Sequence, residues 1–127
     1  MVRQKILRHI FHFHGLKESF TFAFKGIAYM FLYHRNMRII FMLGLMAVLL
    51  GCYFQLNAAE LIVLSITITL VFMAEMFNTA IEMLMNMLTA KYHVRIKLVK
   101  DIAAGVVLLA SLNALFVGYG LFVKRLF

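Results

Sequence analysis

Long apolar stretches alternate with basic, polar segments along this chain. The first apolar stretch covers residues 39–54, the second begins near Glu60 and runs to residue 88, and the third covers residues 102–123. A helix needs roughly 20 predominantly apolar residues to cross the hydrocarbon core of a bilayer. The pattern therefore predicts three membrane-spanning helices over 39–54, 60–88 and 102–123. The first is slightly short, and the last turns of the second are expected to emerge from the membrane.

Residues 1–33 follow a different pattern, in which basic residues and histidines interleave with aromatic and aliphatic ones. The part from Leu16 to Lys25 is too polar to span a bilayer, but its apolar residues fit an amphipathic helix lying at the membrane surface. A soluble amphipathic helix packed on the bundle is the alternative. His9, His12 and His14 are interpreted as interfacial packing or a pH-sensitive surface rather than a metal site.

Composition supports a membrane protein made of one domain over residues 1–127. Hydrophobic residues make up 65% of the chain, more than a soluble domain of this size needs, and there is no proline to interrupt long helices. The predicted fold is therefore an all-α integral membrane protein with three transmembrane helices and an N-terminal amphipathic surface helix. Three short spans bury little surface against one another, so we expect the chain to oligomerise. The single cysteine, Cys52, is interpreted as a small buried hydrophobe.

The positions of the positive charges predict an orientation. Seven of the 13 Lys and Arg residues precede the first span, four lie in the predicted loop over residues 89–100, and two follow the third span. Basic residues are enriched in cytosolic loops, which places the N-terminus and the basic loop inside and the C-terminus outside. A net charge of +8 arranged in this way indicates attraction to anionic membrane lipids rather than to nucleic acid.

Polar residues form a stripe on the second predicted helix. Glu75, Asn78, Glu82 and Asn86 fall within an arc of about 80° on a helix that turns 100° per residue. Carboxylates are expensive in hydrocarbon, and neither Glu has a Lys or Arg within one turn to pair with. A structural contact between helices would need only one Asn, so the stripe favours a functional site.

The depth of the stripe in the membrane indicates which kind of functional site it forms. Glu75 lies roughly 21 Å from the outer end of its helix, which is nearer the cytosolic face than the midplane. This depth suits a reaction between a water-soluble co-substrate and a lipid headgroup, whereas a proton-coupled carrier would more naturally hold its carboxylate near the middle. Lys100 and Asp101 are expected to begin the third helix, where they are candidates for a phosphate and divalent-metal site. Asp101 is also a plain helix-start residue.

Three segments together resemble the small bacterial membrane lipid kinases, the prokaryotic diacylglycerol kinase and undecaprenol kinase family. They are E-M-F-N-T-A-I-E over Glu75–Glu82, K-Y-H over Lys91–His93 and V-K-D-I-A-A-G over Val99–Gly105. This order and spacing is highly specific. Weaker similarity extends upstream through residues 25–27 and 35–38, so that the resemblance covers about residues 18–123.

The resemblance implies a homotrimer of three-helix subunits with active sites between subunits at the cytosolic surface of the inner membrane. It implies an enzyme that transfers phosphate from ATP to a lipid alcohol. By the same resemblance Glu75 is the general base, Asn78 supports the site, and Glu82 binds the divalent ion carried by ATP, Mg²⁺ or another ion such as Mn²⁺. Lys100 and Asp101 are implied to contact the nucleotide.

Two positions depart from the family pattern. His34 stands where the family has an acidic metal ligand, and Asn86 stands where the family commonly has Asp. Magnesium prefers hard oxygen ligands, so a His should weaken its binding, although His34 can ligate Mn²⁺ or Zn²⁺ or hydrogen-bond a phosphate. The alternative is a catalytically impaired relative that acts as a lipid- or nucleotide-binding scaffold. The role of His93 stays open.

Overall fold

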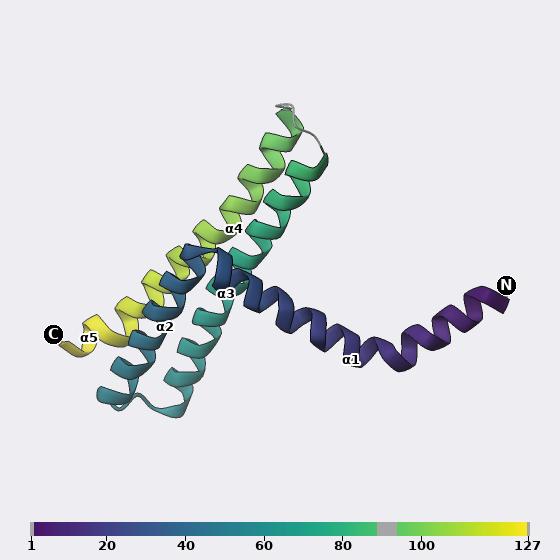
Figure 1. Cartoon of the computed structure of the whole chain (residues 1–127). Helices are drawn as coiled ribbons and strands as arrows, with labels where there is room; N and C mark the ends of the chain where they lie inside the picture. The colour runs from purple at the N-terminus through teal and green to yellow at the C-terminus, as the bar shows by residue number, and fades with distance from the viewer. Residues whose placement is uncertain (1, 89–93, 127) are drawn as a thin grey trace. The chain divides into compact units, whose positions relative to one another are not determined.

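The structure is a computed structural model. It describes the backbone of residues 2–88 and 94–126 and the side chains of residues 15–88 and 94–126. The elements in chain order are α1 (Val2–Tyr33), α2 (Arg35–Tyr53), α3 (Ala58–Leu88), α4 (Val94–Gly118), the π-helix η1 (Tyr119–Val123) and α5 (Lys124–Leu126) (Figure 1). The chain forms two compact units, residues 1–35 and residues 36–127.

The first unit consists of helix α1. Four large apolar side chains at helical spacing, Leu16, Phe20, Phe24 and Ile27, are all exposed. They form one face of the helix because their spacing of four, four and three residues keeps them within about 80°. Other exposed apolar side chains, Phe22 and Leu32, lie outside this face, so the amphipathic character of α1 and its location at a membrane surface stay predictions. The backbone N–H of His34 donates to the Met30 carbonyl at 3.0 Å where α1 ends.

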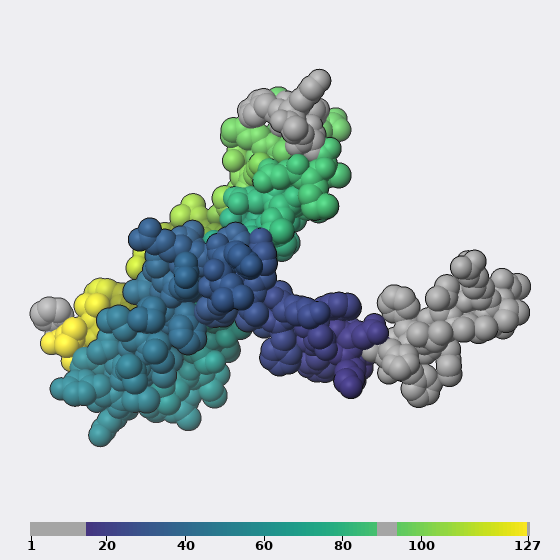
Figure 2. All heavy atoms as spheres, viewed as in Figure 1, coloured from purple at the N-terminus to yellow at the C-terminus, as the bar shows by residue number. Residues whose placement is uncertain are grey.

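The second unit contains three helices that are long and apolar enough to cross a membrane, residues 35–53, 58–88 and 94–126. This confirms the predicted all-α fold with three spans. Most of their large apolar side chains are exposed, as expected for surfaces that face lipid. Figure 2 shows α2 and the beginning of α3 along one face of this unit.

Helices α2 and α4 extend beyond their predicted spans at the end where basic residues begin, whereas α3 begins two residues before its predicted start and ends at the predicted residue 88. Helix α2 starts at Arg35 rather than at residue 39, and α4 starts at Val94, within the predicted loop over residues 89–100. Asp101 consequently lies beyond the first turn of α4, and its interpretation as a helix-start residue is wrong. Charged residues end a membrane span but not a helix, because Arg and Lys are good helix formers.

Two glycines in α2 allow α3 to approach. A Cβ atom at Gly44 would lie 3.1 Å from the side chain of Ile68, and one at Gly51 would lie 3.1 Å from Leu56 and 3.5 Å from Leu64. Leu56 and Leu64 are buried as a result. Helices α3 and α4 pack side by side and antiparallel, with the most extensive contact of any pair of described elements (Figure 1).

The connection between α2 and α3 caps the end of α2 and the start of α3. Gln55 has φ 55°, and the N–H groups of Gln55 and Leu56 donate to the carbonyls of Cys52 and Gly51. These two bonds form a Schellman motif with Gln55 in the left-handed position that glycine usually occupies. Helix α3 then begins with a capping box, in which Asn57 and Glu60 each accept a hydrogen bond from the other's backbone N–H at 2.8 and 3.2 Å.

One ion pair ties the far end of the third membrane helix to this connection. Arg125 in α5 donates to the Glu60 carboxylate at 2.5 Å and to the Phe54 carbonyl at 3.4 Å. A π-helix has more residues per turn than an α-helix. The π-helix η1 therefore changes the direction in which the residues after it project. This anchor fixes η1 and α5 against the beginning of α3.

Candidate functional site

The predicted polar stripe lies along the last four turns of α3. Glu75 and Asn78 are half-buried, whereas Glu82 and Asn86 are exposed. From Glu75 to Asn86 the stripe rises about 16 Å along the helix axis. Among the residues that the structure describes, the carboxylates of Glu75 and Glu82 form no hydrogen bond or ion pair. No described side chain therefore occupies either carboxylate.

The Asn78 side chain strengthens the functional interpretation. Its Oδ1 atom is buried and has no hydrogen-bond partner in the described part of the chain. A buried polar atom left in this state destabilises the fold by about 1–3 kcal/mol, so native proteins rarely keep one without a reason. Asn78 lies one turn from Glu75 on the same face. A hydroxyl group placed between the two side chains could hydrogen-bond to both of them.

Lys100 joins α4 to the stripe. Its Nζ atom donates to Oδ1 of Asn86 at 2.8 Å, although the two residues are 14 positions apart in the sequence. The antiparallel arrangement of α3 and α4 produces this contact. A lysine ammonium group, the usual point charge for binding phosphate, therefore lies about one turn of α3 beyond the unpaired Glu82.

Asp101 points elsewhere than its neighbour. Its carboxylate accepts a hydrogen bond from Lys97 at 2.6 Å, and both side chains are more than half exposed. Successive residues of a helix project 100° apart, so Lys100 contacts α3 while Asp101 pairs along α4. The structure thus brings Lys100 to the stripe but does not bring Asp101 there. Nucleotide contact by Asp101 stays a prediction.

His34 belongs to the first unit, and its ring centroid lies 5.6 Å from that of Tyr29. Lys91, Tyr92 and His93, part of the sequence pattern, lie outside the described residues. Within the described residues no three His, Cys, Asp or Glu side chains gather closely enough to form a metal cage. Magnesium, however, is commonly held by one or two carboxylates together with substrate phosphates, and the exposed, unpaired Glu82 fits that kind of binding.

Sequence reasoning missed two features of the second unit. The first is a cavity between α2, α3 and α4, which runs along the same face of α3 as the stripe. The second is the anchor between Arg125 and Glu60. An Asn-x-x-Glu pattern over residues 57–60 signals the capping box, and opposite charges at one end of the bundle signal the anchor. Nothing in the sequence signals the cavity.

The fold and the stripe define the class of protein. The second unit has three membrane-length helices, and one of them, α3, carries two carboxylates on one face that have no partner among the described residues. Lys100 is hydrogen-bonded at the end of that face. Ionisable residues inside membrane segments mark functional sites. The chain is thus a helical membrane protein with a candidate reaction site, rather than a simple anchor.

Comparison with known proteins identifies the family. The family described as prokaryotic diacylglycerol kinase matches residues 21–122, and the chain belongs to this family. A diacylglycerol kinase from Synechocystis is 38% identical over 105 residues, which are 82% of this chain and 60% of that protein. An undecaprenol kinase from Bacillus subtilis is 28% identical over 109 residues, 86% of this chain and 89% of that protein. The chain thus spans 60% of the length of the Synechocystis relative.

Proposed function

We propose that this chain transfers the γ-phosphate of ATP to the hydroxyl group of a lipid alcohol, either diacylglycerol or undecaprenol. The observation that carries the proposal is the pair of unpaired carboxylates on α3, with Lys100 hydrogen-bonded at 2.8 Å to the end of the same stripe. The two relatives, a diacylglycerol kinase and an undecaprenol kinase, both support a lipid alcohol as the acceptor.

Glu75 is the proposed general base. Its carboxylate accepts the proton of the lipid hydroxyl while that oxygen forms a bond to the γ-phosphorus and the bond from phosphorus to the ADP oxygen breaks. Asn78, one turn away, would orient the hydroxyl by donating from its side-chain amide N–H to the hydroxyl oxygen, while the hydroxyl proton faces Glu75. Phosphoryl transfer depends mainly on positioning and charge stabilisation, so two side chains on a rigid helix suffice for this half of the site.

Glu82 and Lys100 are proposed to bind the nucleotide end. A divalent ion, Mg²⁺ or Mn²⁺, neutralises the charge of the phosphates when it is bound. Glu82 would hold that ion, and Lys100 would exchange its hydrogen bond to Asn86 for one to a phosphate oxygen. The family resemblance adds Asp101 as a nucleotide contact and His34 as the second metal ligand.

The proposed reaction takes place at the cytosolic face of the bacterial inner membrane. The basic residues that precede α2 and those at the start of α4 support this orientation, with the N-terminus inside and the C-terminus outside. The same residues would attract anionic lipids. A homotrimer, which the resemblance implies, would supply the remaining contacts to sites between subunits.

The proposal is tested by phosphate transfer from labelled ATP to diacylglycerol and undecaprenol, with purified protein in detergent and with Mg²⁺ and Mn²⁺ compared. Glu75→Gln keeps the shape of the side chain but removes the base, and we expect kcat to fall at least 100-fold. Glu18→Gln removes an exposed carboxylate of α1 outside the matched region and should leave kcat unchanged. Full activity in Glu75→Gln would refute the assigned mechanism.

A catalytically impaired relative that acts as a lipid- or nucleotide-binding scaffold is the second candidate function. It is favoured by one observation, the His at position 34, where the family resemblance implies an acidic metal ligand. The variant His34→Glu separates the two functions. A large gain in Mg²⁺-dependent transfer means that the site is complete except for one ligand. No transfer with either residue, from folded and oligomeric protein, supports the scaffold.

A further inference from the structure

Two lysines of α4 have hydrogen-bond partners that differ in charge. Lys97 donates to the Asp101 carboxylate at 2.6 Å, which forms an ion pair along one helix. Lys100 donates instead to the amide oxygen of Asn86 at 2.8 Å, and among the described residues it has no carboxylate partner. The first pair is neutral as a whole, whereas the pair of Lys100 and Asn86 keeps a net positive charge.

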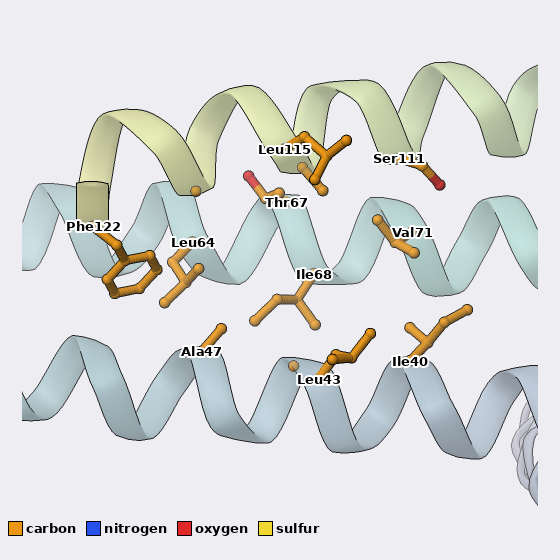
Figure 3. A pocket seen from close by; sticks show the side chains of 13 residues that line it. Ile40, Leu43, Ala47, Leu64, Thr67, Ile68, Val71, Ser111, Leu115 and Phe122 are labelled. Carbon is orange, nitrogen blue, oxygen red and sulfur yellow. The ribbon is translucent and has the colours of Figure 1, made fainter. Parts of the chain in front are cut away.

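Asn86 lies at the end of the stripe that is farther from the apolar cavity between α2, α3 and α4 (Figure 3). None of the described residues that line this cavity is charged, and Val71, the last of them on α3, lies about 22 Å from Asn86 along the helix axis. Glu82, the proposed holder of the divalent ion, is one turn from Asn86. The negative phosphates of a nucleotide therefore meet a positive charge at the Asn86 end of the stripe.

The hydrogen bond between Lys100 and Asn86 contributes little to holding α3 and α4 together. These two helices already make the most extensive contact of any pair of described elements. Asn86 is exposed and Lys100 is half-buried, so water competes for both polar groups. What the bond does change is the position of the ammonium group, because a long lysine side chain is otherwise free to sample many rotamers.

We propose that Asn86 is a positioning residue, which holds the Lys100 ammonium group beside Glu82 until a phosphate group of the nucleotide displaces the amide. The inference rests on the proposed kinase function and adds how the nucleotide end of the site is prepared before ATP arrives. A side chain that is already held in place loses less conformational entropy when it binds its ligand. Asn86 acts through Lys100, and its effect should appear in the binding of ATP.

The neutral charge of the Asn86 amide makes the exchange favourable. Lys100 exchanges an uncharged acceptor for an ionised phosphate oxygen, to which an ammonium group is more strongly attracted. A carboxylate at position 86 would remove this gain, and at one turn from Glu82 it would add a like charge that repels the phosphates. After the exchange the Asn86 amide is exposed to water, so no buried acceptor is left without a partner.

The variant Asn86→Asp tests the inference, because it keeps the shape of the side chain and changes its charge. We expect it to raise the KM for ATP at least about 10-fold, and to leave unchanged both kcat and the KM for the lipid alcohol that the unmodified chain phosphorylates. Asn86→Leu removes the acceptor without adding a charge, and should raise the KM for ATP only about 2–5-fold.

Gln55→Glu is the matched control for Asn86→Asp. It makes the same change from amide to carboxylate at an exposed position, in the connection that precedes α3 at the opposite end of this helix from Asn86. It should change neither KM nor kcat. Equal increases in the KM for ATP in Asn86→Asp and Asn86→Leu would show that the neutral charge of Asn86 does not matter, and would overturn the proposal.

A second readout does not depend on phosphate transfer. Acylation of lysine amines by a sulfo-N-hydroxysuccinimide ester can be followed for each residue by mass spectrometry. ATP with Mg²⁺ or Mn²⁺ should slow the acylation of Lys100 at least about 5-fold in the unmodified chain and in Glu75→Gln, because the phosphate covers the amine. At the same ATP concentration this protection should disappear in Asn86→Asp. Acylation of Lys124, which is exposed at the other end of the third membrane helix, should not respond to ATP.

The outcomes separate the two proposals. Protection of Lys100 by ATP that Asn86→Asp abolishes, without phosphate transfer by the unmodified chain, would refute the kinase function and support the role of Asn86 in a nucleotide site. Phosphate transfer with the same KM for ATP in Asn86→Asp as in the unmodified chain would overturn the role of Asn86 alone. Equal protection of Lys100 in both chains, or no protection in the unmodified chain, would overturn it as well.

Discussion

Replacing Arg125 by leucine removes both hydrogen bonds that anchor α5 to the beginning of α3. The guanidinium group donates to the Glu60 carboxylate at 2.5 Å and to the Phe54 carbonyl at 3.4 Å. The aliphatic part of the side chain is largely preserved by leucine, so the change acts mainly on the polar contacts. Glu60 keeps its hydrogen bond from the Asn57 N–H at 3.2 Å, so its carboxylate is not left without a partner.

The size of the expected loss in stability follows from the solvent exposure of Arg125 and Glu60. A hydrogen bond to a charged group contributes about 1.5–3 kcal/mol, whereas an exposed ion pair contributes about 0.2–1 kcal/mol. The Arg125 and Glu60 side chains are 37% and 23% exposed, so solvent screens part of their attraction. The bond to the Phe54 carbonyl is long and adds little. We therefore expect Arg125→Leu to lower the free energy of unfolding by about 1–1.5 kcal/mol.

Reversible unfolding in mixed detergent and SDS micelles measures this change, and a double-mutant cycle assigns it. Glu60→Gln keeps the capping box but removes the charge, and we expect a coupling energy with Arg125→Leu of about 1 kcal/mol. Arg125→Lys should lose part of the stabilisation, because an ammonium group lacks the fork that reaches both acceptors. The coupling should shrink as salt is added.

Two results would refute this reasoning about the anchor. A coupling energy within error of zero would mean that Arg125 and Glu60 do not interact in the folded protein. A loss above about 3 kcal/mol from Arg125→Leu, with the same loss in Arg125→Lys, would mean that the residue is packed in a way that its exposure does not reveal.

Three further predictions concern other parts of the second unit. Gln55→Gly should raise the free energy of unfolding by about 0.5–1 kcal/mol in the same micelle titration, because Gln55 has φ 55° and glycine is unstrained there; a loss would contradict the Schellman cap. Gly51→Leu should lower it by about 1–3 kcal/mol through overpacking against Leu56 and Leu64, whereas Gly120→Leu should change it by less than about 0.5 kcal/mol. Lys100→Met should raise the KM for ATP at least 10-fold in the phosphate-transfer assay without changing the KM for the lipid, and a change in the lipid KM alone would place Lys100 at the wrong substrate.

The number of membrane helices could be predicted from the sequence because hydropathy is a property of each segment by itself. The ends of the helices could not, since Arg35 and Val94 lie in stretches that are too polar to span but still favour helix. The predicted loop before residue 100 failed for this reason. Asp101, predicted at the start of a helix, lies in the interior of α4, where it pairs with Lys97.

The candidate site was predictable in part. The stripe from Glu75 to Asn86 follows from helical periodicity alone, and the structure keeps it on one face. The contact between Lys100 and Asn86 depends on how two antiparallel helices are aligned, which no local pattern determines. The cavity depends on side chains from three helices together, and the π-helix η1 has no sequence signal that would predict it.

Phosphate transfer from labelled ATP to a panel of lipid alcohols, by the unmodified chain and by Glu75→Gln in parallel, tests the central claim most directly. The account predicts a labelled lipid product from diacylglycerol or undecaprenol in the presence of Mg²⁺ or Mn²⁺, and at least a 100-fold lower kcat in Glu75→Gln. Folded, oligomeric protein that labels no lipid with either ion, or a Glu75→Gln variant as active as the unmodified chain, would contradict it.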